Sequence, residues 1–102
     1  MREYLVEYDP EAEIDLILLR NWLIEIGSFG HALEYLRKLK REVAELSYRA
    51  GILPESRFHM PKLYHPEAKT MPVCKRKLTV ILHIDGDYVI VDKILPSAMV
   101  TY

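Results

Sequence analysis

The strongest constraint on the fold is a short turn between two runs rich in β-branched residues. These runs, 78–84 and 88–95, are separated only by the Asp-Gly-Asp segment 85–87. A tight hairpin turn needs positive φ, which glycine adopts without steric cost, so Asp-Gly between such runs predicts two adjacent antiparallel strands. Pro96 closes the second run, and residues 73–75 are a candidate for a preceding strand.

The N-terminal part of the chain predicts one strand followed by a helix. Residues 2–8 alternate charged and apolar side chains with a period of two, which is typical of a half-buried strand. Asp9 and Pro10 then begin a helix, because aspartate caps free backbone amides and proline suits the first helical position. Apolar residues in 14–26 cover more than one face of this helix. One apolar face is enough to pack a helix on a core, so the additional apolar residues are either buried between a sheet and a second helix or left exposed for a partner.

A second helix follows the break at Gly27 and Ser28. Its apolar residues recur at alternating spacings of three and four: Phe29, Ala32, Leu36, Leu39, Val43, Leu46 and Ala50. This narrow seam is typical of a helical hairpin, and Gly51 and Pro54 end the helix close to its last member. The expected fold is therefore α+β in the order β-α-α-β-β-β, with an antiparallel sheet packed against an N-terminal helical hairpin. We expect a single domain over residues 1–102.

The connector between the helices and the sheet, residues 51–72, contains four prolines. Proline lacks an N–H and restrains the preceding residue, so a long regular element is not expected here. Long loops in compact domains are often functional, and this one carries His59 and His65 together with three bases.

Composition excludes several classes of protein. Half of the 102 residues are hydrophobic, so one core can be buried without disulfides or metal. Asp15, Arg20 and Glu25 interrupt the longest apolar stretch before it reaches the roughly 18 residues of a membrane span. With no signal-peptide pattern at the start, we expect a soluble cytoplasmic protein. Cys74 is the only cysteine, and the histidines lack zinc-site spacings, so we expect no disulfide, metal or cofactor.

The net charge of −1 hides an uneven distribution. Residues 1–36 hold eight acids and two bases, whereas residues 37–102 hold seven acids and twelve bases. A contact with nucleic acid would therefore come from the second part of the chain. The alternative is that the two parts attract each other across the fold.

Three stretches, in this order, resemble the RelE/ParE superfamily of bacterial toxins. Residues 8–16 contain Pro-Glu-Ala-x-x-Asp-Leu, which looks like the start of that family's first helix. Residues 31–40 are similar to its second helix, and residues 84–91 to its terminal hairpin. Together with the length, the resemblance covers nearly the whole chain.

The resemblance implies a cognate antitoxin that wraps the toxin with a helix and an extended segment. The excess apolar surface of the first helix fits such a partner, and we expect the antitoxin to contact Leu19, Trp22, Leu23 and Ile26. The family includes ParE-like inhibitors of DNA gyrase, associated with plasmid stabilization, and RelE-like ribosome-dependent mRNA endonucleases. Oligomeric state, including a homo-oligomer, is left open.

The sequence departs from the family where RelE-like nucleases carry their chemistry. Aligned on the Asp-Gly turn, Leu78, Thr79 and Leu82 occupy the positions of an aromatic-Arg-x-x-Tyr pattern. After the last strand, no Arg, His or Tyr precedes Tyr102. These departures favour a ParE-like toxin that binds gyrase. The alternatives are a RelE-like endonuclease and a non-toxic member that acts as a binding module.

Lys75, Arg76 and Lys77 form the densest basic run beyond the second helix and are the candidate target-binding residues. On a strand, two of them would point the same way, toward phosphates or acidic side chains. The alternative, which explains the basic run equally well, is that these residues are simply exposed to solvent at the start of a strand.

Weak catalytic candidates are His65, Lys77 and Tyr102, since a metal-independent ribonuclease can use such groups to move protons and stabilise charge. A plain surface role is the alternative for the loop histidines. His83 is expected to lie across from Tyr88 in the hairpin.

Overall fold

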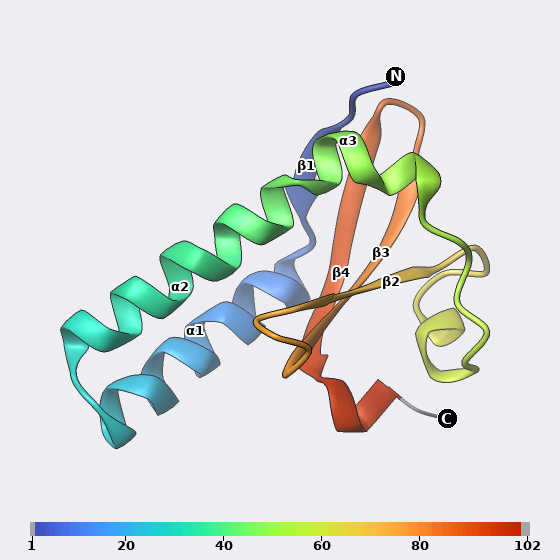
Figure 1. Cartoon of the computed structure of the whole chain (residues 1–102). Helices are drawn as coiled ribbons and strands as arrows, with labels where there is room; N and C mark the ends of the chain where they lie inside the picture. Colours follow the sequence, from blue (N-terminus) through green and yellow to red (C-terminus); the bar gives the residue numbers. More distant parts are fainter. Residues whose placement is uncertain (1, 101–102) are drawn as a thin grey trace.

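The computed structural model describes residues 2–100 as two long helices packed against a four-stranded sheet (Figure 1). The elements are β1 (Leu5–Tyr8), α1 (Pro10–Ile26), α2 (Phe29–Ala44), α3 (Leu46–Arg49), η1 (Ala50–Ile52), η2 (Met60–Leu63), β2 (Lys69–Val73), β3 (Leu78–Asp85), β4 (Tyr88–Pro96) and η3 (Ser97–Val100). The predicted α+β class and the order of its main elements are confirmed.

The sheet has the strand order β1-β4-β3-β2. The three C-terminal strands, β2, β3 and β4, pair with one another in antiparallel fashion, as predicted, and Asp85 pairs with Tyr88 across the turn. Gly86 lies in that turn with φ of 61°, the conformation for which glycine is suited. β1 adds to the edge of β4 in parallel, so the complete sheet is mixed.

The strand before the hairpin differs from the predicted residues 73–75. β2 ends at Val73, and Cys74, Lys75 and Arg76 have φ of 52°, 56° and 66°. This left-handed run reverses the chain into β3, so the basic residues lie on a turn instead of alternating along a strand. Pro72 is tolerated because β2 is an edge strand.

The helix boundaries follow from local capping. The Asp9 side chain accepts a hydrogen bond from the Glu11 amide, and the Ser28 hydroxyl accepts one from the His31 amide. α2 ends at Ala44, earlier than predicted, but α3 and η1 continue the helical path to Ile52.

Replacing Asp9 with alanine is expected to lower the free energy of unfolding by about 1 kcal/mol, because the first turn of α1 loses its cap. Urea unfolding of the purified protein measures the change. Asp9→Ser is the matched control, since serine also caps and should restore most of the loss. Equal losses in both variants would contradict the capping role.

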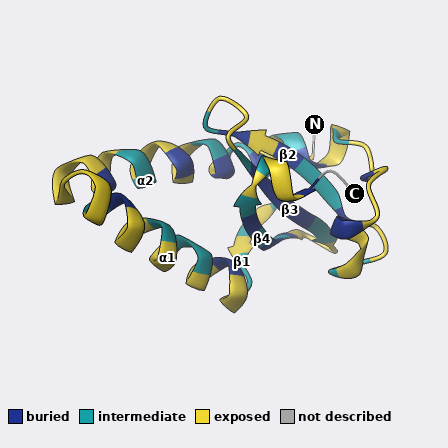
Figure 2. Cartoon of the chain, turned by 90° about the horizontal axis from the view of Figure 1, so that it is seen from below, coloured by how far each residue is buried: buried dark blue, intermediate teal, exposed yellow. Residues whose placement is uncertain are grey.

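The core lies between the helices and the inner face of the sheet. Its largest fully buried members include Leu39, Val43 and Leu46 from the helices, and Val80, Leu82, Val89 and Val91 from the sheet. The far end of the α1–α2 hairpin projects beyond the sheet and is mostly exposed (Figure 2). Helical apolar residues there are not covered by the sheet, and the candidate site lies where the hairpin meets one end of the sheet.

The outer face of the sheet is covered by the strap, which we define as residues 53–68. Met60 and Ala68 from the strap are buried against Ile81 of β3. Within residues 2–100, no helix is long and apolar enough to cross a membrane.

Candidate functional site

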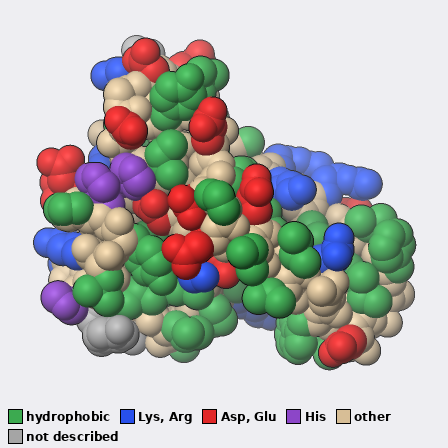
Figure 3. Space-filling model, turned by 180° about the vertical axis from the view of Figure 1, so that it is seen from behind, with side chains coloured by type: hydrophobic (Ala, Val, Ile, Leu, Met, Phe, Trp, Pro, Cys, Tyr) green, Lys and Arg blue, Asp and Glu red, His purple; other side chains and the backbone are tan. Residues whose placement is uncertain are grey.

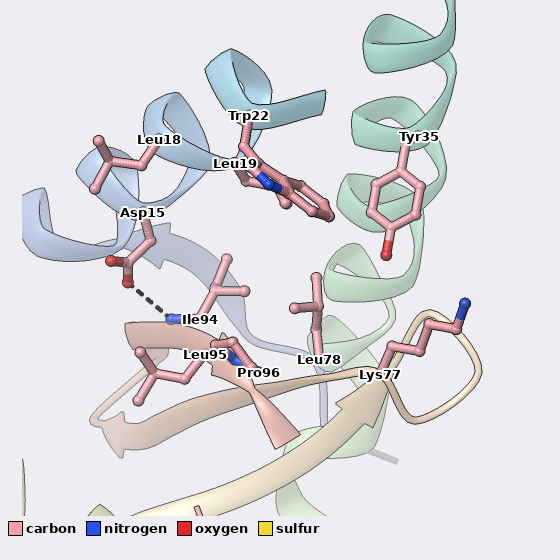
Figure 4. A pocket seen from close by; sticks show the side chains of 10 residues that line it. All are labelled: Asp15, Leu18, Leu19, Trp22, Tyr35, Lys77, Leu78, Ile94, Leu95 and Pro96. Carbon is pink, nitrogen blue, oxygen red and sulfur yellow. Dashed lines mark hydrogen bonds between the residues drawn. The ribbon is translucent and has the colours of Figure 1, made fainter. Parts of the chain in front are cut away.

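An apolar groove opens between the helical hairpin and one end of the sheet (Figure 4). Its volume is about 520 Å³. The residues that line it are Asp15, Leu18, Leu19, Trp22, Tyr35, Lys77, Leu78, Ile94, Leu95 and Pro96. We call this the hairpin groove.

Helical periodicity explains the α1 wall of the hairpin groove. Asp15, Leu18, Leu19 and Trp22 are spaced by three, one and three residues, which places them on one face of a helix. Tyr35 of α2 closes the opposite side (Figure 4).

Several large apolar side chains around the groove remain open to solvent. Trp22 is 54% exposed and Leu18 is 60% exposed. Seen from behind, hydrophobic side chains gather over the hairpin and beside the sheet (Figure 3). Single exposed apolar residues are ordinary, but a contiguous set that lines a groove is typical of a protein-binding surface.

Asp15 is the one acidic residue among the described residues that line the groove, and both of its carboxylate oxygens accept hydrogen bonds. Its carboxylate accepts hydrogen bonds from the Ile94 amide at 3.0 Å and from Lys93 Nζ at 2.9 Å. The pairing of β1 with β4 ends at Val91, so the next part of the β4 edge has no strand beside it. Asp15 accepts the hydrogen bond from the Ile94 amide on this unpaired edge. Its hydrogen bond is also the main reason why the pKa of Lys93 is raised. Asp15 therefore fixes the helix to the sheet.

Of the four residues predicted to bind an antitoxin, Leu19 and Trp22 line the groove. Ile26 is 59% exposed at the end of α1. Leu23 is only 3% exposed, so it packs within the protein and offers almost no surface to a partner. Sequence reasoning missed Leu18, which the helical spacing from Trp22 could have revealed.

A second hollow, the basic pocket, adjoins the hairpin groove and shares Tyr35 and Lys77 with it. Its volume is about 340 Å³. It is lined by Tyr35, Lys38, Glu42, Cys74, Lys75 and Lys77. The three lysines give one end of the combined surface a positive character.

The left-handed turn is held in place beside this pocket. Glu42 Oε2 accepts a hydrogen bond from the Cys74 amide at 2.9 Å. Burial raises the pKa of Tyr35 to about 12, with further contributions from Cys74 and Glu42. Burial also raises the pKa of the Cys74 thiol. Both groups are therefore neutral near pH 7, and the lysines supply the exposed charge.

The catalytic candidates lie in different places. Lys77 lines the groove and the basic pocket, whereas His65 belongs to the strap on the outer face of the sheet. Tyr102 lies outside the described residues. His83 pairs with Ile90, so the expected position across from Tyr88 was wrong.

The structure instead brings His65, His83 and Asp92 together. The two imidazole rings are stacked with centroids 4.0 Å apart, and His83 Nδ1 lies 2.7 Å from Asp92 Oδ2. The pKa of Asp92 is raised by burial, against the opposing effect of the His83 hydrogen bond. Among residues 2–100, no group of three His, Cys, Asp or Glu side chains is arranged to hold a metal ion.

No protein-family model matches the chain, and no curated protein sequence matches it. Among solved structures, it is similar to a chain from the chromosomal ParDE toxin–antitoxin (TA) system of P. aeruginosa, with a TM-score of 0.78 and 13% identity. The match covers 92% of this chain and 96% of that chain. The protein therefore has a ParE-like fold.

Proposed function

We propose that this chain is the toxin of a type II toxin–antitoxin system, and that it acts on DNA gyrase by binding. The single observation that carries the proposal is the hairpin groove, an open apolar surface on a fold shared with a ParDE system. A monomer does not need this surface for its own core. A second polypeptide that covers it explains why large apolar side chains are left exposed.

The shape and chemistry of the surface define the segment that would occupy it. The α1 wall presents Leu18, Leu19 and Trp22, which suits the apolar side of an amphipathic helix. At the end that adjoins the basic pocket, Lys75 and Lys77 would pair with acidic side chains. We infer an antitoxin segment with apolar residues at helical spacing followed by Asp or Glu.

The same basic turn is our candidate for contact with the target. Lys75, Arg76 and Lys77 are exposed on the turn between β2 and β3, where they can approach an acidic protein surface or a phosphate backbone. An antitoxin whose acidic end covers this turn would silence the toxin by competing with the target for it.

Reversing two charges with Lys75→Glu and Lys77→Glu together is expected to weaken antitoxin binding about tenfold at low salt. The salt dependence of binding should also become shallower, because fewer charge pairs are screened. Isothermal titration with the product of the adjacent small reading frame measures both effects. Arg57→Glu with Lys62→Glu, in the strap, is the matched control and should change neither.

The target is tested by adding the purified chain to bacterial DNA gyrase in a supercoiling assay. Inhibition that disappears when the antitoxin is added supports the proposal. If supercoiling is unchanged and ribosome-bound mRNA is cleaved in a parallel reaction, gyrase inhibition is contradicted and the RelE-like endonuclease alternative is supported. Inactivity in both assays would favour the non-toxic binding module.

A further inference from the structure

Another hollow lies between the two long helices, on the side of the hairpin that faces away from the hairpin groove. Its volume is about 430 Å³. It is lined by Leu16, Ile17 and Arg20 from α1, and by Leu33, Leu36, Arg37 and Lys40 from α2. We call this hollow the rear groove.

Helical periodicity keeps the rear groove separate from the hairpin groove. An α-helix turns by about 100° per residue, so the α1 residues of the rear groove lie roughly opposite the four α1 residues of the hairpin groove. On α2, the same spacing puts Tyr35 on the hairpin-groove side, away from Leu33, Leu36 and Lys40. A substitution in one groove therefore leaves the lining of the other groove intact.

The floor of the rear groove is apolar and open to solvent. Leu16 and Leu36 are half-buried and pack against the main core. Ile17 is 48% exposed and Leu33 is 43% exposed, although they lie beside those two residues in one hollow. Contiguous exposed apolar side chains of this kind are typical of a surface that another molecule covers.

The rim of the rear groove is positively charged on both walls. Arg20 is exposed on α1, and Arg37 and Lys40 are exposed on α2. None of the described residues that line the groove is acidic. Arg37 contacts Glu34 at 3.3 Å, but these side chains are 66% and 54% exposed, so solvent screens their ion pair and a partner's acid can replace Glu34. Lys and Arg side chains lie beside hydrophobic ones on the hairpin in Figure 3.

This combination of floor and rim selects among possible occupants. A second copy of the chain would bring the same three cations to the same hollow, and like charges repel. Nucleic acid would pair with the cations but would leave the apolar floor uncovered. A bilayer surface is flat, whereas the hollow between two helices is filled by a rod-like segment.

We propose that the rear groove binds an acidic amphipathic helix of another protein, which packs between α1 and α2 as a third helix. The apolar stripe of that helix covers Ile17 and Leu33, and acids on both sides of the stripe pair with the cations of the two walls. Charges beside the apolar seam of a coiled coil select partners in the same way. The proposal does not depend on the toxin assignment, because the hairpin groove lies on the other side of the helices.

The test is fluorescence anisotropy with two labelled synthetic helical peptides of about 20 residues. Both peptides carry leucine at the a and d positions, and the flanking e and g positions are glutamate in one peptide and lysine in the other. The wild-type chain is expected to bind the acidic peptide at least about tenfold more tightly than the basic one. Arg37→Glu together with Lys40→Glu should remove this preference. Leu33→Asn, which keeps all three cations, should weaken binding of the acidic peptide about tenfold by making the floor polar.

Arg57→Glu with Lys62→Glu, in the strap, makes the same change in net charge and is the matched control, which should bind as the wild type does. Trp22→Ala, in the hairpin groove, should also leave the affinity unchanged. Equal affinity of the wild type for both peptides, or binding that is lost in Trp22→Ala and kept in the Arg37 and Lys40 variant, would overturn the proposal. Two other results would also overturn it: a wild-type dimer that Leu33→Asn dissociates in sedimentation, or binding to phosphatidylglycerol vesicles without binding to the acidic peptide.

Discussion

Replacing Trp22 with alanine is expected to weaken antitoxin binding about a hundredfold, as for a large aromatic anchor in an interface. The indole lines the hairpin groove and is 54% exposed. Its removal therefore costs little folding stability while deleting the largest apolar side chain offered to a partner. Calorimetric titration and urea unfolding separate the two effects.

Leu63→Ala is the matched control for Trp22. Leu63 is 65% exposed on η2, outside the groove, so its truncation should leave antitoxin affinity within about threefold. Wild-type affinity in Trp22→Ala, or equal losses in the two variants, would contradict the assignment of the groove as the antitoxin site.

Replacing Asp15 with alanine is expected to lower the free energy of unfolding by about 3 kcal/mol, which is the cost of breaking a largely buried ion pair. The side chains of Asp15 and Lys93 are 11% and 19% exposed, so solvent compensates little for the lost partner. The Ile94 amide also loses its acceptor. Urea unfolding measures the loss, and Glu13→Ala, on the exposed side of α1, should change stability by less than about 0.5 kcal/mol.

The pH dependence of the Asp15 variant gives an independent check. The pKa of Lys93 is raised in the folded protein, mainly by its hydrogen bond to Asp15. When folding raises the pKa of a base, the resulting stabilisation is fully present below the pKa of the unfolded chain, about 10.4 for lysine. The stabilisation is lost as the pH rises through the pKa of the folded protein. The difference in free energy of unfolding between the wild type and Asp15→Ala should therefore become smaller above about pH 10.5. If this difference in stability stays constant across that pH range, the ion pair of Asp15 with Lys93 does not cause it.

The parts of the fold that sequence predicted are those set by neighbouring residues. The β3–β4 hairpin follows from Gly86 between two β-branched runs, and the start of α1 follows from Asp9 and Pro10. The parallel pairing of β1 with β4 depends on residues more than eighty positions apart, for which the sequence carries no local signal.

The left-handed turn at 74–76 was missed because its residues are cysteine, lysine and arginine. These side chains rarely adopt positive φ, and no glycine marks the reversal. The long-range contact of Glu42 with the Cys74 amide accompanies this conformation. Propensity alone therefore favoured a strand over the turn.

The candidate site was predicted only in part. Apolar residues on several sides of α1 indicated a partner surface, but only packing distinguishes the buried Leu23 from the exposed Trp22. The cluster of His65, His83 and Asp92 was not predicted, because the expected register put His83 across from Tyr88 instead of Ile90 and no sequence signal brings residue 65 to this face. Asp92 is the extra residue of a β-bulge opposite Ile81 and Leu82, which has no marker in the sequence either.

The most direct test of the toxin role is bacterial growth when the chain is induced alone and together with the product of the adjacent small reading frame. We expect growth arrest by the chain alone, relief by the neighbour, and loss of that relief when the chain carries Trp22→Ala. Normal growth during confirmed expression of the folded chain, or arrest that the neighbour does not relieve, would contradict it.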